Sequence, residues 1–157
     1  MQIRYANVTD ATTIKNFIFQ LAEYEKLTHE CVITEEKIIE TLFNEHSKAQ
    51  VIIAEDRNIP VGFALFFENY STFLGKGGIY LEDLFVLPEY RNLGFGKALL
   101  KFIANVAVTQ NAGRFEWSVL DWNTPAIKFY ESIGAKAMSD WTVYRLSGES
   151  LTNFANS

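Results

Sequence analysis

This sequence is poor in the residues that make disulfides, metal sites and membrane anchors. It has one cysteine, Cys31, so it cannot form an intrachain disulfide, and this usage predicts a reducing compartment and a cytoplasmic location. Its two histidines, His29 and His46, have no cysteine or carboxylate at ligand spacing, so we expect no metal. No apolar run approaches the length of a membrane span, and residues 1–13 lack a signal-peptide core. We therefore predict no membrane association.

Basic residues are also scarce, which narrows the choice of partners. The formal net charge is −5, and proteins that bind nucleic acid through its phosphates need clustered lysine and arginine. We therefore predict no nucleic-acid partner, whereas a cationic substrate is compatible with the charge. The chain is, in contrast, rich in apolar residues. Hydrophobic residues make up 48% of it and aromatic residues 15%, which predicts a well-packed hydrophobic core. We expect a single domain over residues 1–147, followed by a polar tail at 148–157.

The order of apolar patterns along the chain predicts an α/β fold. We expect a mixed, mostly antiparallel sheet of about six to seven strands flanked by about four helices. Residues Tyr70–Gly78, which include three glycines, are expected to form a loop. The predicted strands are Ile3–Ala6, Gln50–Glu55, Ile59–Phe67, Ile79–Leu87, Arg114–Leu120, Ala135–Ser139 and Thr142–Leu146. The predicted helices follow caps at Thr9 or Asp10, at Thr34 and at Thr124, and one spans Lys97–Val108. We also expect Gly134 to end the helix that begins at Thr124 and Asp56-Arg57-Asn58 to form a hairpin turn.

The most informative segment is Arg-Asn-Leu-Gly-Phe-Gly at residues 91–96, between a predicted strand and a predicted helix. Two glycines let the backbone approach a ligand closely, where the unpaired N–H groups of the helix start attract an anion. The first helical turn carries Lys97 and no acid, although the helix dipole favours negative charge at this end. A bound phosphate would supply that negative charge. The segment lacks the Gly-Lys-Ser/Thr ending of a nucleotide triphosphatase loop and the three-glycine spacing of a dinucleotide-binding turn. It predicts another kind of phosphate ligand, although similar turns also occur in folds that bind nothing there.

Two adjacent acids, Glu82 and Asp83, lie inside the apolar strand predicted at Ile79–Leu87. Burying an unpaired carboxylate costs roughly several kcal/mol, so each needs a partner or a function. In a regular strand the two side chains point to opposite faces, and both reach one site only if a β-bulge intervenes. One of them could instead pair with a core arginine. We favour Glu82 as the functional acid.

These segments together resemble a known family. The glycine turn, Glu23-Tyr24-Glu25, Tyr80-Leu81-Glu82-Asp83 and the run Asp-Trp-Asn-Thr-Pro-Ala-Ile-Lys-Phe-Tyr at 121–130 are similar to the GNAT superfamily of N-acetyltransferases. Within it, they resemble the diamine (spermidine/spermine) and thialysine acetyltransferase branch. The resemblance spans Ile3–Leu146. It implies direct transfer of an acetyl group from acetyl-CoA to a primary amine, without an acyl-enzyme, and we also expect a homodimer.

The resemblance implies a role for each matching residue. Tyr130 would act as the general acid beside the thioester sulfur, and Glu82 would accept the amine proton directly or through water. The amine side of the site would consist of Tyr24, Glu25, Glu82 and Asp83. The coenzyme would be bound by the backbones of Phe85 and Val86, by Arg91, by the amides of Asn92, Leu93, Gly94, Phe95, Gly96 and Lys97, and by Asn123.

Elementary chemistry limits two of these roles. A phenol has a pKa of about 10 and a thiol about 8.5, so hydrogen bonding by Tyr130 to the departing sulfur is easier than complete proton transfer. Without the family, Tyr130 would be read as a core aromatic and Asn123 as a helix cap. Acetylation of protein or peptide amines and a non-catalytic acyl-CoA-binding domain remain alternatives. The combination of Glu82, Asn123 and Tyr130 favours an enzyme acting on a small amine.

Overall fold

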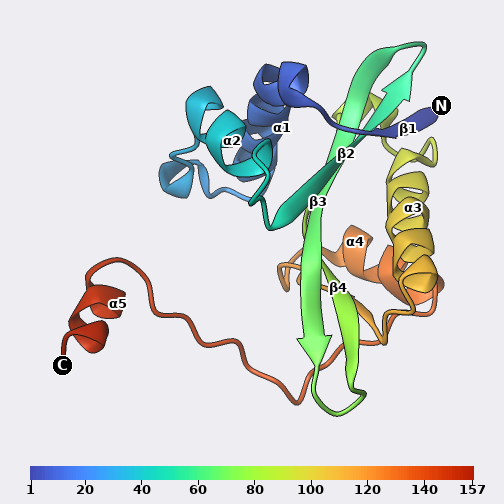
Figure 1. Cartoon of the computed structure of the whole chain (residues 1–157). Coiled ribbons are helices and arrows are strands. Elements are labelled where there is room, and N and C mark those ends of the chain that lie inside the picture. Colours follow the sequence, from blue (N-terminus) through green and yellow to red (C-terminus); the bar gives the residue numbers. More distant parts are fainter. The chain divides into compact units, whose positions relative to one another are not determined.

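The structure, a computed structural model, describes all 157 residues and divides them into two compact units, Met1–Ser118 and Val119–Ser157. Figure 1 follows the elements along the chain. The first unit contains a five-stranded sheet and three α-helices, and the second contains two α-helices and no strand. The predicted α/β class with a mixed, mostly antiparallel sheet is confirmed. The sheet has five strands, fewer than the six to seven expected, and there is one more helix than expected.

The sheet of the first unit has its strands in sequence order, β1-β2-β3-β4-β5. The strands β1 (Gln2–Tyr5), β2 (Ala49–Asp56), β3 (Ile59–Ser71) and β4 (Lys76–Val86) are antiparallel to their neighbours. The last strand, β5 (Phe115–Trp117), runs parallel to β4. Between β2 and β3, Arg57 and Asn58 both have positive φ, the backbone of a two-residue hairpin turn that matches strand twist.

The loop predicted over Tyr70–Gly78 is much shorter in the structure. β3 continues to Ser71 and β4 begins at Lys76, so Gly77 and Gly78 lie within a strand. A side chain at Gly78 would collide with the side chains of Asn69 and Arg114. This glycine therefore reflects a close approach of neighbouring strands and not a turn.

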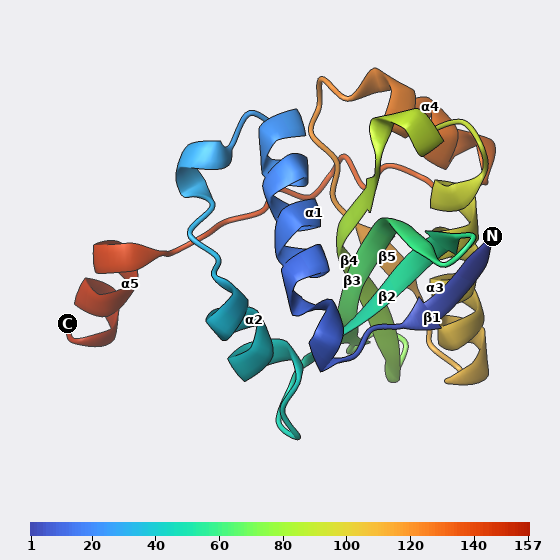
Figure 2. The same ribbon diagram turned by 90° about the horizontal axis from the view of Figure 1, so that it is seen from above.

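Three helices cover the two faces of the sheet. Figure 2 shows α1 (Ala11–Tyr24) and α2 (Glu35–Leu42) on one side and α3 (Phe95–Thr109) on the other. The predicted cap of α2 is confirmed, because Thr34 Oγ1 accepts the N–H of Lys37 at 3.2 Å. A 3-10 turn, Val8–Asp10, leads into α1, and its capping box is formed by Asn7 and Asp10. Two further 3-10 turns are Thr28–Glu30 and Pro88–Tyr90.

The core beneath α1 supports the end of β4. Phe17 of α1 stacks on Phe63 of β3, with ring centroids 5.7 Å apart, and meets Phe85 of β4 at 5.9 Å. Leu21 of α1 and Leu87, just after β4, belong to the same cluster. The C-terminal half of β4 is thus fixed against α1 by buried apolar side chains, which stabilises the backbone where the predicted site residues lie.

The second unit contains α4 (Thr124–Ser132) and α5 (Gly148–Ala155). The strands predicted at Ala135–Ser139 and Thr142–Leu146 are wrong, because these segments form no ladder. Residues such as Val143 and Tyr144 favour strands only when a neighbouring strand accepts their hydrogen bonds, and this unit offers none. The polar tail predicted at 148–157 contains α5. No helix of the chain is long and apolar enough to cross a membrane.

Candidate active site

The parallel pairing of β4 with β5 is short, and this opens the sheet within the first unit. The register joins Ile79 to Phe115, Tyr80 to Glu116 and Leu81 to Trp117, where β5 ends. β4 continues to Val86 without a β5 partner, while its other side remains paired with β3. After Leu81, some backbone N–H and C=O groups of β4 point toward the side where β5 has ended. These groups have no strand partner, so they can form hydrogen bonds to a ligand.

The hydrogen-bond alternation of the β3–β4 pair shows which residues have such groups. Leu87 N–H donates to Val61 O at 2.9 Å, so the alternating antiparallel pattern directs the N–H and C=O of Phe85 toward β3 and those of Val86 away from it. Leu84 has the same orientation as Val86. Of the two strand residues predicted to contact the coenzyme arm, Val86 has the suitable backbone, and Phe85 contributes a buried ring. Sequence reasoning missed Leu84, which the two-residue periodicity could have indicated.

The glycine turn has the geometry expected of an anion site. Gly94 caps α3 in the left-handed region, with φ of 89°, and no side chain caps the helix. The first bond of the helix runs from Ala98 N–H to Gly94 O at 2.9 Å. The N–H groups of Phe95, Gly96 and Lys97 precede that bond and have no acceptor inside the helix. They are available to a phosphate, together with the positive end of the helix dipole.

The surroundings of Gly96 show whether this turn has room for a phosphate ligand. A Cβ at Gly96 would have Val86 Cγ2 as its nearest contact at 3.9 Å, an ordinary van der Waals distance, and the φ of Gly96 is not positive. Neither packing nor backbone conformation of this chain therefore requires glycine here. The smallest residue does allow a ligand to approach the N–H groups closely. With Lys97 exposed and no acid in the first turn, the turn fits the pyrophosphate of a coenzyme.

Arg91 precedes this turn and connects it to α1. Its Nε donates to Val86 O at 3.0 Å. Its Cζ lies 4.8 Å from the ring centroid of Tyr24 and 5.7 Å from that of Phe85, within cation–π range. Tyr24 is the last residue of α1. The predicted coenzyme residue Arg91 and the predicted amine-side residue Tyr24 are therefore in direct contact.

A β-bulge brings the strand acids together. Leu65 pairs with Asp83 and Phe66 with Leu81, so Glu82 is the extra residue of β4. This is the irregularity that would allow both acids to reach one site. Asp83 shares its face of β4 with Phe85, which packs against α1. Glu25 immediately follows α1, and its negative charge and that of Glu82 act on Asp83.

The electrostatics of this acid group differ from those of a salt bridge. Burial, followed by the charges of Glu82 and Glu25, raises the pKa of Asp83 to about 6. Burial also raises the pKa of Glu25. The alternative that a core arginine pairs with the strand acids is not observed, since Arg4 bonds Asp10 and Glu55, and Arg114 bonds Glu116. The structure thus places Glu25 and Glu82 within electrostatic range of Asp83, and Glu25 directly follows Tyr24. No salt bridge joins this acid group to an arginine.

Asn123 and Tyr130 belong to the second unit. Asn123 is the N-cap of α4, one residue before the cap predicted at Thr124, and its Oδ1 accepts the N–H of Ala126 at 3.4 Å. Tyr130 is partly buried in α4, with its ring centroid 5.7 Å from that of Phe129. Gly134 ends this helix in the left-handed conformation as predicted, with φ of 89°. The catalytic role of Tyr130 and the coenzyme contact of Asn123 stay predictions.

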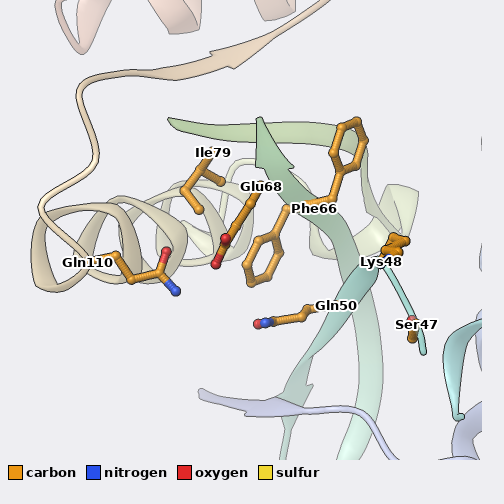
Figure 3. Close-up of a pocket in the computed structure, with 8 residues that line it drawn as sticks. Ser47, Lys48, Gln50, Phe66, Glu68, Ile79 and Gln110 are labelled. Atoms are coloured by element: carbon orange, nitrogen blue, oxygen red, sulfur yellow. The ribbon is translucent and has the colours of Figure 1, made fainter. Parts of the chain in front are cut away.

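A cavity of about 500 Å³ lies elsewhere in the first unit. Figure 3 shows Phe66, Glu68, Ile79 and Gln110 projecting around it. Gln110 caps the C-terminal end of α3, whereas Gly94 caps its N-terminal end, about 22 Å away along a helix of this length. None of the predicted site residues lines this cavity. The site is therefore identified by its backbone geometry and charges and not by cavity size.

Comparison with known proteins agrees with this geometry. The model of the acetyltransferase (GNAT) family matches residues 16–135. The chain is 35% identical to L-ornithine N5-acetyltransferase NATA1 of Arabidopsis thaliana, over 96% of this chain and 86% of the relative. It is 34% identical to thialysine N-epsilon-acetyltransferase of Mus musculus, over 98% and 96%. An integron cassette protein from the mobile metagenome of V. cholerae superposes with a TM-score of 0.84 at 29% identity, covering 99% of this chain and 98% of that one.

The family model covers most of the chain, and the relatives align with nearly its full length. The same segment contains the glycine turn and the open end of β4 described above. The chain therefore belongs to the GNAT family and is an acetyl-CoA-dependent N-acetyltransferase of the branch that acts on amines.

Proposed function

We propose that this enzyme acetylates a primary amine of a small diamine, polyamine or lysine-like amino acid. The observation that carries the proposal is an acid group without an arginine partner. Glu82 and Asp83 lie on the strand that leads into the glycine turn, and Glu25 is the C-cap of α1. The names of the relatives, which specify ornithine and thialysine, support a small substrate with a second charged group. Carboxylates are the natural partners of that second ammonium.

The coenzyme side would be formed by the turn and the free edge of β4. Arg91 and the amides of Asn92–Lys97 would hold the pyrophosphate of acetyl-CoA, and the backbones of Leu84 and Val86 would bond its arm. By resemblance to the family, Asn123 would also contact the coenzyme arm. Acetyl-CoA supplies the acetyl thioester, and the chain's part is to orient it and to exclude water.

Removing the proton of the amine is the demanding step. An alkyl amine has a pKa of about 10.4, so deprotonating it at neutral pH costs roughly 4 to 5 kcal/mol. Glu82, exposed at the bulge, would accept this proton directly or through water. Asp83, with its pKa near 6, would hold the ammonium of the substrate's other end when ionised. Tyr130 would donate a hydrogen bond to the departing sulfur.

A substrate comparison tests the proposal. We expect kcat/KM for ornithine or a diamine to exceed that for a monoamine of equal length by at least about tenfold, the effect of roughly 1.4 kcal/mol of charge recognition. A lysine-containing peptide is the third substrate, because acetylation of protein amines is the alternative within this family. Equal rates with all three would contradict the acidic pocket. Binding of acetyl-CoA without turnover of any amine would support a regulatory domain.

A matched control separates this pocket from general surface charge. Glu40 lies exposed on α2, on an element that carries no predicted site residue. Glu40→Gln should keep the preference for the diamine, whereas Glu25→Gln should reduce it. We further propose a homodimer and a cytoplasmic location, and sedimentation equilibrium tests the first of these.

A further inference from the structure

We propose that Arg91 is a positioning residue for the amine side of the site, coupling occupancy of the phosphate-binding turn to amine binding through its contact with Tyr24. The inference rests on the proposed function, since it requires an amine beside Glu25 and Asp83. It assigns Arg91 an action beyond holding the pyrophosphate.

The orientation of Arg91 is fixed from two directions. Its Nε donates to Val86 O at 3.0 Å, which ties the side chain to the end of β4. Its Cζ lies over the Tyr24 ring, 4.8 Å from the ring centroid. A guanidinium has five N–H donors, and the bond to Val86 O uses only the one on Nε. The Nη groups would therefore bond an anion while Cζ stays over the Tyr24 ring.

Tyr24 stands where α1 ends. Glu25 follows as the C-cap, and Lys26 has a φ of 63°, so the chain leaves the helix sharply at this point. The last turn of α1 contains no basic residue, and the cation stacked on Tyr24 comes instead from the loop after β4. Holding Tyr24 thus restrains the end of α1 that presents Glu25.

Glu25 is in turn coupled to the strand acids. Its charge is one of the causes that raise the pKa of Asp83. The chain of interactions therefore runs from the glycine turn through the Arg91–Tyr24 contact to Glu25, and from Glu25 by its charge to Asp83. A phosphate at the turn would fix the guanidinium over the Tyr24 ring and reduce the motion of Tyr24. Amine binding would then lose less conformational entropy, because Tyr24 is already ordered. Coenzyme and amine would therefore increase each other's affinity by the same factor.

Calorimetric titration with CoA lacking the acetyl group tests this without turnover. In the wild-type enzyme we expect CoA to tighten binding of the diamine at least fivefold. Tyr24→Phe, which keeps the ring, should retain this coupling, and Tyr24→Leu should lose it while binding CoA alone within twofold of wild type. Arg91→Gln should lose the coupling and also weaken CoA binding. Thermal unfolding of each variant checks that it is folded.

A double-mutant cycle makes the test specific to the contact. In the Tyr24→Leu background, Arg91→Gln should cause no further change in diamine affinity in the presence of saturating CoA. Additive losses in the double variant would overturn the proposal, as would full coupling in Tyr24→Leu. Arg91→Lys keeps the charge but not the planar guanidinium. Compared with Arg91→Gln, it should therefore restore CoA affinity to a greater extent than the coupling between CoA and diamine binding.

A spectroscopic readout distinguishes failure of this inference from failure of the proposed function. With ¹³C-labelled tyrosine, addition of CoA should shift the Tyr24 resonance in the wild-type enzyme and leave it in place in Arg91→Gln. If the enzyme acetylates diamines but this resonance does not move, the positioning role is wrong and the proposed function stands. If the resonance moves but no diamine binds or reacts, the proposed function is wrong, and with it the coupling to an amine.

Discussion

The first unit contains two groups of acidic residues whose electrostatic surroundings are opposite. In the first group, Arg4 donates to both oxygens of Asp10 at 2.8 and 2.9 Å and to Glu55 at 2.8 Å. Asp10 is 7% exposed and Glu55 8%. The hydrogen bond from Arg4 holds the pKa of Asp10 below its ordinary value. Its salt bridges connect β1, β2 and the residue that precedes α1, so the role of this group is structural.

In the second group, the charges of Glu25 and Glu82 act on Asp83, and no salt bridge joins these acids to an arginine. The pKa of Asp83 is consequently raised to about 6, the opposite direction from Asp10. A buried acid that is paired supports the fold, whereas clustered acids without a counter-charge reduce stability. Under the proposed function, the second group would bind a cation from outside the chain, the substrate ammonium. The following predictions test this contrast.

Breaking the first group should have the largest effect on stability. Arg4→Met removes the cation and leaves two buried carboxylates unpaired, so we expect a loss of about 3 kcal/mol in the free energy of unfolding of the first unit. Urea denaturation measures it. The kcat of the folded enzyme should change little, because Arg4 lies outside the candidate site. A variant as stable as wild type would show that Asp10 and Glu55 need no counter-charge.

Removing a charge from the second group should affect catalysis instead. Glu82→Gln should lower kcat/KM by ~10²-fold, as expected when a proton acceptor is lost, and its rise with pH should move toward the pKa of the amine. Rates from pH 6 to 10 check both effects. Glu116→Gln, which also removes an acid from a strand of the sheet, is the matched control and should retain activity. An unchanged pH profile in Glu82→Gln would exclude this residue from proton transfer.

The smallest effect has the opposite sign: Asp83→Asn should stabilise the enzyme. The pKa of Asp83 rises from 3.8 to about 6 on folding, so between these values the folded state binds more protons than the unfolded state. Its contribution to stability therefore falls as pH rises through this window, and the penalty is complete above pH of about 7. We expect the variant to gain about 1 to 2 kcal/mol at pH 8 after allowance for partial solvent screening, and nothing at pH 3.5.

Urea denaturation at both pH values tests this, with Asp10→Asn as the paired comparison. The pKa of Asp10 is lowered on folding, so its contribution is present above pH of about 4 and is lost as pH falls through the folded pKa. Asp10→Asn should therefore destabilise the enzyme at pH 8. Loss of stability in Asp83→Asn at pH 8 would mean that an unrecognised cation pairs with Asp83.

Local signals in the sequence predicted the parts of the fold that short-range physics determines. The cap at Thr34, the turn at Arg57 and Asn58 and the left-handed Gly134 all follow from the conformational preferences of single residues. The strands expected over 135–146 failed because strand formation depends on a partner that propensity does not reveal. The glycines before Ile79 were misread because a close approach between strands looks like a turn in sequence.

The candidate site divides in the same way. The glycine turn was predictable because a strand, two spaced glycines and a helix occur in sequence. The adjacent acids pointed to a bulge as a requirement, and the register shift beside Leu65 shows that it exists. The contact of Arg91 with Tyr24 joins residues 67 positions apart in sequence, so no local pattern indicated it. Tyr130 and Asn123 remain assigned by family resemblance alone.

The early end of β5 leaves the end of β4 without a strand partner on one side. For amide hydrogen exchange, this means that the N–H groups of Leu84 and Val86 lie at a strand edge, whereas that of Phe85 is protected by β3. A coenzyme arm bound at this edge, as proposed, would take the place of the missing strand. The local free energy of unfolding at the end of β4 would then rise with the logarithm of the coenzyme concentration, and the rigidity of this region would follow the supply of acetyl-CoA.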